Sequence, residues 1–271
     1  MSFRATLLTL AFALISSVTL PPTSAFATPD DNKKTGVELF LHSDDVMKDV
    51  ESTLARAKES HKLALIVLGA DWCHDSRGLV SHFNDPAMKN LLAENYELTL
   101  VDVEFFEHGL DVVHRFGQPT IIATPTVLII DPTSEKLVNS HNMHQFKEAA
   151  AMSLEDTISY FDAMRLAANQ IPPITSNGDV MLDKLLTEID AFEATQAARI
   201  EVGFQQMVPF LKMPKEESPK EFHDLWMELR GLRYAITGDM AALRKQALER
   251  TEAGQIDITL TYPNYKSFSW E

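Results

Sequence analysis

The sequence contains a single cysteine, Cys73, among 271 residues. A disulfide within one chain needs two cysteines, so the folded protein must rely on its apolar core without a covalent cross-link. One thiol has two interpretations: a buried structural side chain, or a reactive group that its surroundings activate. The position of Cys73 in the fold has to decide between them.

Basic residues are also scarce. The chain holds 24 Lys and Arg residues against 39 Asp and Glu residues, which gives a formal net charge of −15 at pH 7. Removal of residues 1–27, which contain Arg4 and no acidic residue, would change that charge to −16. Nucleic acids and anionic membrane surfaces both bind basic patches, so neither is an expected partner.

Long apolar runs are confined to the N-terminus. Arg4 precedes an apolar stretch at residues 5–20, and the small-residue pattern Ala-Phe-Ala occupies residues 25–27. This arrangement predicts a secretory signal peptide that is cleaved after Ala27, followed by a polar leader at residues 28–36 and export, most simply to a bacterial periplasm. A membrane anchor is the alternative, although the stretch is short for a span and Thr and Ser residues interrupt it. No membrane span is expected in the mature chain.

Several catalytic signatures are missing from the sequence. It has no Gly-rich phosphate loop, no Gly-x-Ser-x-Gly elbow of a serine hydrolase and no His-Glu-x-x-His zinc motif. Scattered carboxylates such as Asp102 and Glu104 are better explained as strand-end and solvated residues. The chemistry therefore has to be sought at the cysteine.

The most informative stretch, residues 63–78, is LALIVLGADWCHDSRG. Its first six residues are an unbroken apolar run, which predicts a central strand covered on both faces. Cys73 follows where a helix can begin, and the unpaired backbone N–H groups and the dipole of a helix start favour thiolate over thiol. Ser76 lies one turn on, where its hydroxyl can bond the sulfur, while His74 and Arg77 can add positive charge opposed by the neighbouring aspartates.

Residues 37–168 alternate between strand and helix patterns. The order predicts a mixed α/β sheet with helices on both faces. We expect strands at residues 37–41, 63–68, 96–103, 121–130 (interrupted by Pro125) and 136–139. We expect helices at residues 44–60 with Ser43 as cap, from the cysteine turn to residue 83, from Pro86 with Asp85 as cap, in a short segment ending near residue 116, and at residues 145–168.

Trp72 and Cys73 at a strand-to-helix turn, with Thr124 and Pro125 at the start of a later strand, resemble the thioredoxin fold. In that family the proline is cis and lies against the active-site cysteine, which leaves the preceding backbone free to pair with a bound peptide or thiol. The resemblance implies that Pro125 is that proline and that Thr124 is the pairing residue. Trp72 can wall off one side of the thiol.

A closer resemblance is to exported thioredoxin-like proteins that have a WCHDSR-type turn, a VDV strand and a GTPTV-like proline loop. Here these motifs occupy residues 72–77, 101–103 and 123–127. The resemblance covers residues 37–166. It is specific to the fold and much less specific to an activity.

The sequence departs from the thioredoxin pattern at two positions. Ser76 stands where thioredoxins have a second cysteine. In thioredoxins that cysteine expels the substrate from a mixed disulfide, and this step is not available here. Val67 stands where they carry a buried acid, so a proton-transfer partner is also missing. Ordinary dithiol activity is therefore not expected.

Residues 169–271 are predicted to be a helical extension with an aromatic tail. A linker at residues 171–178 leads into an amphipathic helix that begins near Val180. Ser218 opens a capping box for the next helix, and Gly238 and Asp239 are predicted to turn the chain into a last helix that ends near residue 254. We expect these last two helices to form a hairpin packed on the main domain.

The final residues alternate between apolar and polar side chains. Residues 256–262 therefore predict an edge strand. Tyr265, Phe268 and Trp270 follow and are expected to cover apolar surface, with the binding of a partner as the alternative.

A metal site is a further hypothesis. His141, Met143 and His144 lie close together in the sequence, and Cys73 and His74 are neighbours, so soft ligands that suit copper are present. Adjacent Cys and His side chains rarely chelate one ion from the start of a helix, and the remaining histidines lie at no recognised ligand spacing. We expect neither a metal nor a cofactor.

Together these features predict an exported thioredoxin-fold protein that acts on protein or small-molecule thiols and disulfides. In this hypothesis Cys73 is the nucleophile, Ser76 stabilises its thiolate, and Thr124 and Pro125 position the partner. One thiol forms a mixed disulfide that an external thiol must resolve, as in monothiol glutaredoxin-like chemistry. The alternative is a redox-inert binding module that keeps the thioredoxin groove but not its chemistry.

Overall fold

The computed structural model describes residues 40–140, 142–167, 174, 178–217 and 219–271. Every described residue belongs to one compact unit of the chain. The predicted signal peptide and the polar leader lie outside the described residues, as does most of the predicted linker at residues 171–178.

A mixed four-stranded sheet lies at the centre of the main domain. Its strands are β1 (Leu63–Gly69), β2 (Tyr96–Asp102), β3 (Thr126–Asp131) and β4 (Lys136–Leu137), in the order β2-β1-β3-β4. β1 runs parallel to β2, with Leu65 opposite Leu98, and antiparallel to β3, with Val67 opposite Val127. β4 is antiparallel to β3. The predicted mixed α/β sheet is confirmed.

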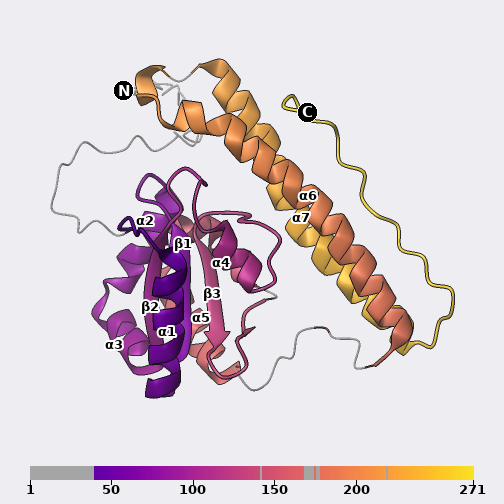
Figure 1. Ribbon diagram of the computed structural model, residues 1–271, viewed down its shortest axis with the longest axis horizontal. Helices are drawn as coiled ribbons and strands as arrows, with labels where there is room; N and C mark the ends of the chain where they lie inside the picture. Colours follow the sequence, from indigo (N-terminus) through magenta and orange to yellow (C-terminus); the bar gives the residue numbers. More distant parts are fainter. Residues whose placement is uncertain (1–39, 141, 168–173, 175–177, 218) are drawn as a thin grey trace, which may run out of the picture. The chain divides into compact units, whose positions relative to one another are not determined.

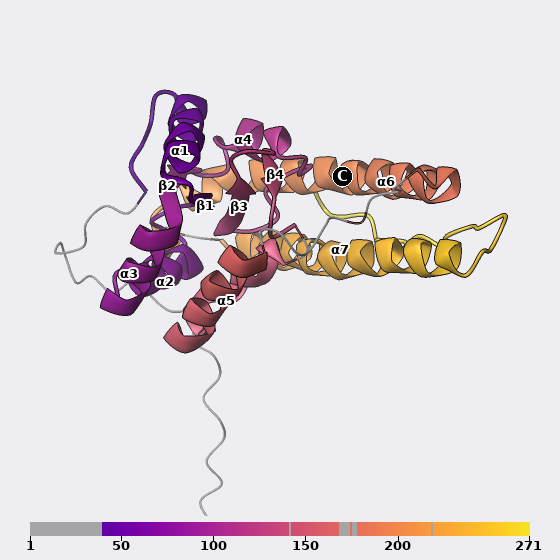
Figure 2. The same ribbon diagram turned by 90° about the horizontal axis from the view of Figure 1, so that it is seen from below.

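Helices cover both faces of this sheet because its strands alternate their side chains between two cores. Leu65 and Val67 of β1 pack in a core with α2 (His74–Phe83), α3 (Pro86–Asn95), α5 (Leu154–Ala167) and a 3₁₀ helix (Met143–Ala151). Ile66 and Leu68 point to the other face, where α1 (Val46–Ser60) and α4 (Leu110–Arg115) pack. Figures 1 and 2 show α1 and α4 on one side of the sheet and α2, α3 and α5 on the other.

Short polar side chains start two of these helices. Asp85 accepts from the N–H of Ala87, with Pro86 at the first position of α3, as predicted. The predicted Ser43 cap of α1 is wrong. Asp45 is the cap and accepts from the N–H of Lys48, while the Ser43 hydroxyl donates to a carboxylate oxygen of Asp49.

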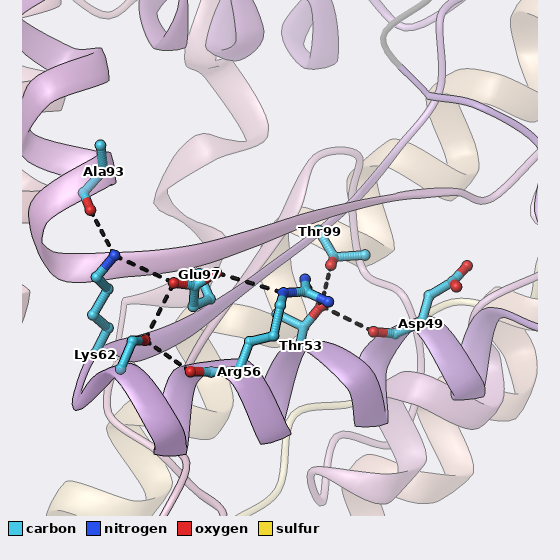
Figure 3. Close-up of polar contacts among 8 residues, drawn as sticks. Asp49, Thr53, Arg56, Lys62, Ala93, Glu97 and Thr99 are labelled. Atoms are coloured by element: carbon cyan, nitrogen blue, oxygen red, sulfur yellow. Dashed lines mark hydrogen bonds and ion pairs between the residues drawn. The ribbon is translucent and has the colours of Figure 1, made fainter.

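A polar network joins α1 to the edge strand β2 (Figure 3). The Glu97 carboxylate accepts from the Lys62 Nζ and the Ser60 hydroxyl, each at 3.2 Å, and pairs with the Arg56 Nε at 3.5 Å. Burial acts to raise the Glu97 pKa, but the hydrogen bonds from Lys62 and Ser60 outweigh it and hold that pKa below its ordinary value. Farther along, the Thr53 and Thr99 hydroxyls are hydrogen-bonded.

Two predicted elements of the main domain differ in the structure. Residues 121–124 form no strand because the ladder between β1 and β3 ends at the pair Leu68–Thr126, and Pro125 has no N–H to extend it. The helix predicted at residues 145–168 is broken: a 3₁₀ helix ends at Ala151, and the Ser153 hydroxyl then accepts from the N–H of Asp156 at the start of α5. Of the strand predicted at residues 37–41, only Phe40 and Leu41 are described, and they are not in a strand.

The C-terminal region is a hairpin of two long helices, α6 (Val180–Leu211) and α7 (Lys220–Glu252), with a short 3₁₀ helix (Lys215–Glu217) between them. Both views show α6 and α7 side by side (Figures 1 and 2). The predicted turn at Gly238 is wrong. α7 continues through it because Ile236 and Met240 extend its apolar stripe against α6, and this packing outweighs the low helix propensity of glycine. The predicted cap Ser218 lies outside the described residues.

The hairpin contacts the main domain through side chains of both helices. Phe204 of α6 stacks on Phe106, and Ile122 of the main domain lies in the apolar core of the hairpin. An ion pair of 3.0 Å joins Lys212 to Glu107. No helix in the described part of the chain is both long and apolar enough to span a membrane.

The C-terminal tail lies against this hairpin. Residues 256–262 form no strand, so that prediction is wrong, and Ile258 and Leu260 are buried in the hairpin core instead. Tyr265, Phe268 and Trp270 also pack against this core. The prediction that these aromatic side chains cover apolar surface is confirmed.

Candidate active site

Cys73 lies at the carboxyl end of β1 and caps the N-terminus of α2. Its backbone carbonyl accepts from the N–H of Arg77, so Cys73 is the N-cap residue of the helix, although its side chain makes no capping hydrogen bond. The side chain is buried, with 9% of its surface exposed, and its Sγ donates to the carbonyl oxygen of Thr124 at 3.3 Å. The peptide bond between Thr124 and Pro125 is cis. The structure thus brings together Cys73, Thr124 and Pro125, which are distant in the sequence.

Trp72 forms a half-buried aromatic wall beside the cysteine. Its Nε1 donates to the carbonyl oxygen of Glu104 at 2.7 Å, which fixes the ring. The ring stacks on Phe105 at 6.1 Å and meets Phe106 edge-on at 5.6 Å between centroids. The loop after β2 therefore holds Trp72 in place.

Ser76 has a different partner from the one the sequence suggests. Its hydroxyl is buried and accepts from the N–H of Ala70 at 3.3 Å. No hydrogen bond joins Ser76 to Cys73 among the residues described, so the expected bond to the sulfur is not formed. Ser76 instead closes the turn between β1 and α2, which keeps the cysteine at the helix start.

His74 and Arg77 lie on the outer side of the same turn. His74 is exposed, and Arg77 donates from its Nη1 to the carbonyl oxygen of Asp71 at 2.6 Å. Between them, Asp75 accepts from the N–H of Ala150 at 3.0 Å. Burial raises the pKa of the Asp75 carboxyl above its ordinary value, and the hydrogen bond from Ala150 opposes that shift.

This geometry agrees with the match to a known protein family. The sequence profile of a family described as thioredoxin-like matches residues 45–132. The main domain is therefore thioredoxin-like. A solved structure titled as a disulphide isomerase from Xylella fastidiosa Temecula1 is 25% identical, with a TM-score of 0.44, and the alignment covers 48% of this chain and 98% of that one. No curated protein matches the chain.

Inside the thioredoxin-like domain, the position of the missing acid is fully apolar. Val67 is completely buried and packs in the same core as Leu65 and Val127. Around it in that core lie further apolar side chains such as Leu79 and Ile129. The position of Val67 therefore supplies no proton-transfer group to Cys73.

Sequence reasoning missed one residue of this site, Arg233 of α7. It is 7% exposed, its Nε donates to the carbonyl oxygen of Ile122, and its Cζ lies 5.1 Å from the ring centroid of Phe204. Burial lowers its pKa to about 10, against the attraction of Tyr234 and Cys73. A signal was present, because Arg233 interrupts the apolar stripe of α7 between Leu229 and Ile236.

The structure gives no support to a metal centre. No group of three His, Cys, Asp or Glu side chains is placed to hold an ion in the described ranges, and His141 lies outside them. Met143 is buried in the core. Burial lowers the pKa of His144 to about 4, so its ring is neutral at pH 7.

Proposed function

We propose that the protein is an exported thiol–disulfide oxidoreductase that uses one catalytic thiol and acts through mixed disulfides at Cys73. The observation that carries this proposal is the position of the sulfur in a thioredoxin-like domain. Cys73 is the N-cap residue of α2, and its side chain lies against the segment that ends at the cis bond between Thr124 and Pro125. A helix start favours the thiolate, which is the attacking species in disulfide exchange.

The reaction balances without an added oxidant or reductant. The Cys73 thiolate attacks one sulfur of a disulfide R–S–S–R′, which forms the mixed disulfide Cys73–S–S–R and releases R′–S⁻. A second thiolate, R″–S⁻, then attacks the R sulfur, which forms R–S–S–R″ and releases Cys73 as thiolate. Each step breaks one S–S bond and makes another, so the external thiol does the work of the missing second cysteine.

The neighbouring residues have separate roles in this proposal. Thr124 and Pro125 position the partner, as the resemblance to thioredoxins implies, and Trp72 walls off one side of the sulfur. Ser76 supports the site indirectly, through its bond to Ala70. Arg77 adds positive charge to the rim, beside the exposed His74. Export rests on the predicted signal peptide, and recovery of the processed chain in the periplasmic fraction of bacteria that express it would test that part.

The test is disulfide exchange with a small disulfide. We expect the purified mature chain, mixed with oxidised glutathione near pH 8, to gain one glutathionyl group by mass spectrometry and to lose it when reduced glutathione is added. Cys73→Ser must gain nothing, and Cys73→Ser tested beside Ser76→Ala separates loss of the thiol from damage to the turn. A wild-type chain that forms no adduct while a cysteine-containing peptide does would contradict the proposal.

One observation favours the second candidate, a redox-inert binding module. Cys73 is 9% exposed and its sulfur is already engaged by Thr124, as in a structural cysteine. This candidate predicts that Cys73→Ala leaves the binding of a partner unchanged. The two candidates therefore differ in whether loss of the thiol matters.

A further inference from the structure

Arg233 is a buried cation supplied to the cysteine site by the C-terminal hairpin. Its side chain leaves α7, lies over the rings of Phe204 and Trp226 at 5.1 and 5.6 Å, and is 7% exposed. Among the described residues, Arg233 forms no ion pair with a carboxylate. A buried guanidinium without such a partner is costly to retain, since its desolvation is not repaid by an opposite charge in contact.

One short backbone segment connects Arg233 to Cys73. The carbonyl oxygen of Ile122 accepts from the Arg233 Nε, and two residues later the carbonyl oxygen of Thr124 accepts from the Cys73 Sγ. Residues 122–124 are all buried. The guanidinium and the thiol thus hold the segment before Pro125 from two different elements, α7 and the start of α2.

Several other charged or titratable groups face this place, and they matter for any effect of pH. Asp75 and Arg230 interact electrostatically with Arg233, as do Cys73 and Tyr234. Burial and the positive charge of Arg233 both lower the pKa of His144, so the His144 ring is neutral at pH 7. Lys147 lies over the Tyr234 ring at 4.2 Å, and His74 acts on Asp75. Arg233 is the cation among these groups that is itself buried.

We propose that Arg233 is a positioning residue for Cys73, whose charge favours the thiolate and whose hydrogen bond fixes the segment that ends at Thr124. The role assigned to Arg233 rests on the proposed function, whereas the alkylation experiment that tests it does not require disulfide exchange. Even with burial lowering its pKa to about 10, the guanidinium stays protonated at pH 7. A fixed positive charge in a water-poor site acts more strongly on a nearby thiolate than an exposed one does.

The test is the pH dependence of Cys73 alkylation by a neutral reagent, iodoacetamide, in the full mature chain. We expect Arg233→Gln, which removes the charge but can still donate to Ile122, to move the midpoint of the rate profile upward by about one pH unit. Arg233→Lys keeps the charge and should leave the midpoint near that of the wild type. Arg244→Gln is the control, because it removes a charge from the same helix together with the ion pair to Glu193.

An unmoved midpoint in Arg233→Gln, or an equal shift in Arg244→Gln, would overturn the inference. A purely structural role would lower the melting temperature of both Arg233 variants and leave the profile unchanged. If Arg233→Gln does not fold, as judged by circular dichroism, the wild-type chain supplies the measurement: the rate ratio of anionic iodoacetate to neutral iodoacetamide. A ratio several-fold above that of a cysteine peptide supports the inference, and a ratio at or below it overturns it.

Alkylation does not require Cys73 to exchange disulfides, so the two proposals can fail separately. If no glutathione adduct forms but the profile of Arg233→Gln shifts, the proposed function fails and this inference stands. If adducts form at the same rate in wild type and Arg233→Gln with the same profile, the inference fails and the proposed function stands.

Discussion

The Oδ1 of Asp75 accepts a hydrogen bond from the backbone N–H of Ala150 at 3.0 Å, and this bond ties the first turn of α2 to the 3₁₀ helix Met143–Ala151. The two elements approach closely because Gly78 lies between them. A Cβ added at Gly78 would lie 2.7 Å from the Cα of Ala150. The cysteine turn is therefore held by Asp75 as well as by the contact between Cys73 and Thr124.

Asp75→Asn tests the ionic state of this contact. Burial raises the Asp75 pKa above 3.8, so the folded chain binds this proton more tightly than the unfolded chain does. The stability that Asp75 contributes is complete below about pH 3.8 and is lost as pH rises through the folded-state pKa. Asparagine keeps the acceptor and cannot ionise. The free energy of unfolding of Asp75→Asn minus that of the wild type should therefore increase from about pH 4 to about pH 7. Urea titrations at both pH values measure this, and an equal increase in the exposed-site control Asp183→Asn would contradict it.

Asn139→Ala should destabilise the thioredoxin-like domain. The Asn139 side chain is buried, accepts from the N–H of Ile129 at 2.9 Å and donates to the carbonyl oxygen of Val127 at 2.8 Å. It thereby completes the edge of β3 where β4 has ended. Alanine leaves both backbone groups unpaired, so we expect a loss of about 3 kcal/mol in urea unfolding. Asn84→Ala, at an exposed helix end, is the matched control. A similar loss of stability in Asn84→Ala would contradict the claim that the hydrogen bonds of Asn139 to β3 cause the effect.

Gly238→Ala distinguishes a continuous α7 from a turn. A Cβ at Gly238 meets nothing within 4 Å, so alanine should stabilise the chain by up to about 1 kcal/mol through its higher helix propensity. Gly203→Ala should do the opposite, because a Cβ there would lie 2.9 Å from Leu229 Cδ1 and 3.2 Å from Trp270 Cζ2. Thermal unfolding of both variants gives the answer. Destabilisation by Gly238→Ala would mean that α7 is interrupted at that position.

Phe204→Ala should expose Cys73. The Phe204 ring stacks on Phe106 with centroids 3.6 Å apart and lies beneath Arg233, so it joins the hairpin to the loop that also holds Trp72. Its removal should cost about 3–5 kcal/mol and speed the labelling of Cys73 by a neutral reagent at fixed pH. The rate in urea-unfolded chain sets the upper limit. Phe222→Ala removes a ring elsewhere in the hairpin, and an equal gain there would argue against Phe204 as the cover of the site.

Local signals in the sequence predict several elements correctly. The apolar run at residues 63–68 forms β1 because such a run needs cover on both faces, and Asp85 with Pro86 starts α3 because both residues satisfy the needs of a helix start. The start of α2 at Cys73 follows from the same reasoning, whereas the pairing of Cys73 with Thr124 came from the resemblance to thioredoxins. These signals act within a few residues along the chain, so they survive without knowledge of the rest.

Contacts between groups that are distant in the sequence depend on how the folded chain packs. Ser76 bonds Ala70 rather than the sulfur because its side chain points into the turn behind the cysteine. α7 runs through Gly238 because α6 offers a continuous apolar face, which no local propensity records. Arg233 reaches the cysteine site because the hairpin packs on the main domain. Its position in the apolar stripe of α7 predicts that the side chain is buried, but it does not predict which residue the side chain contacts. Long-range packing selects such contacts by shape and desolvation, and neither is written in the spacing of residues along the chain.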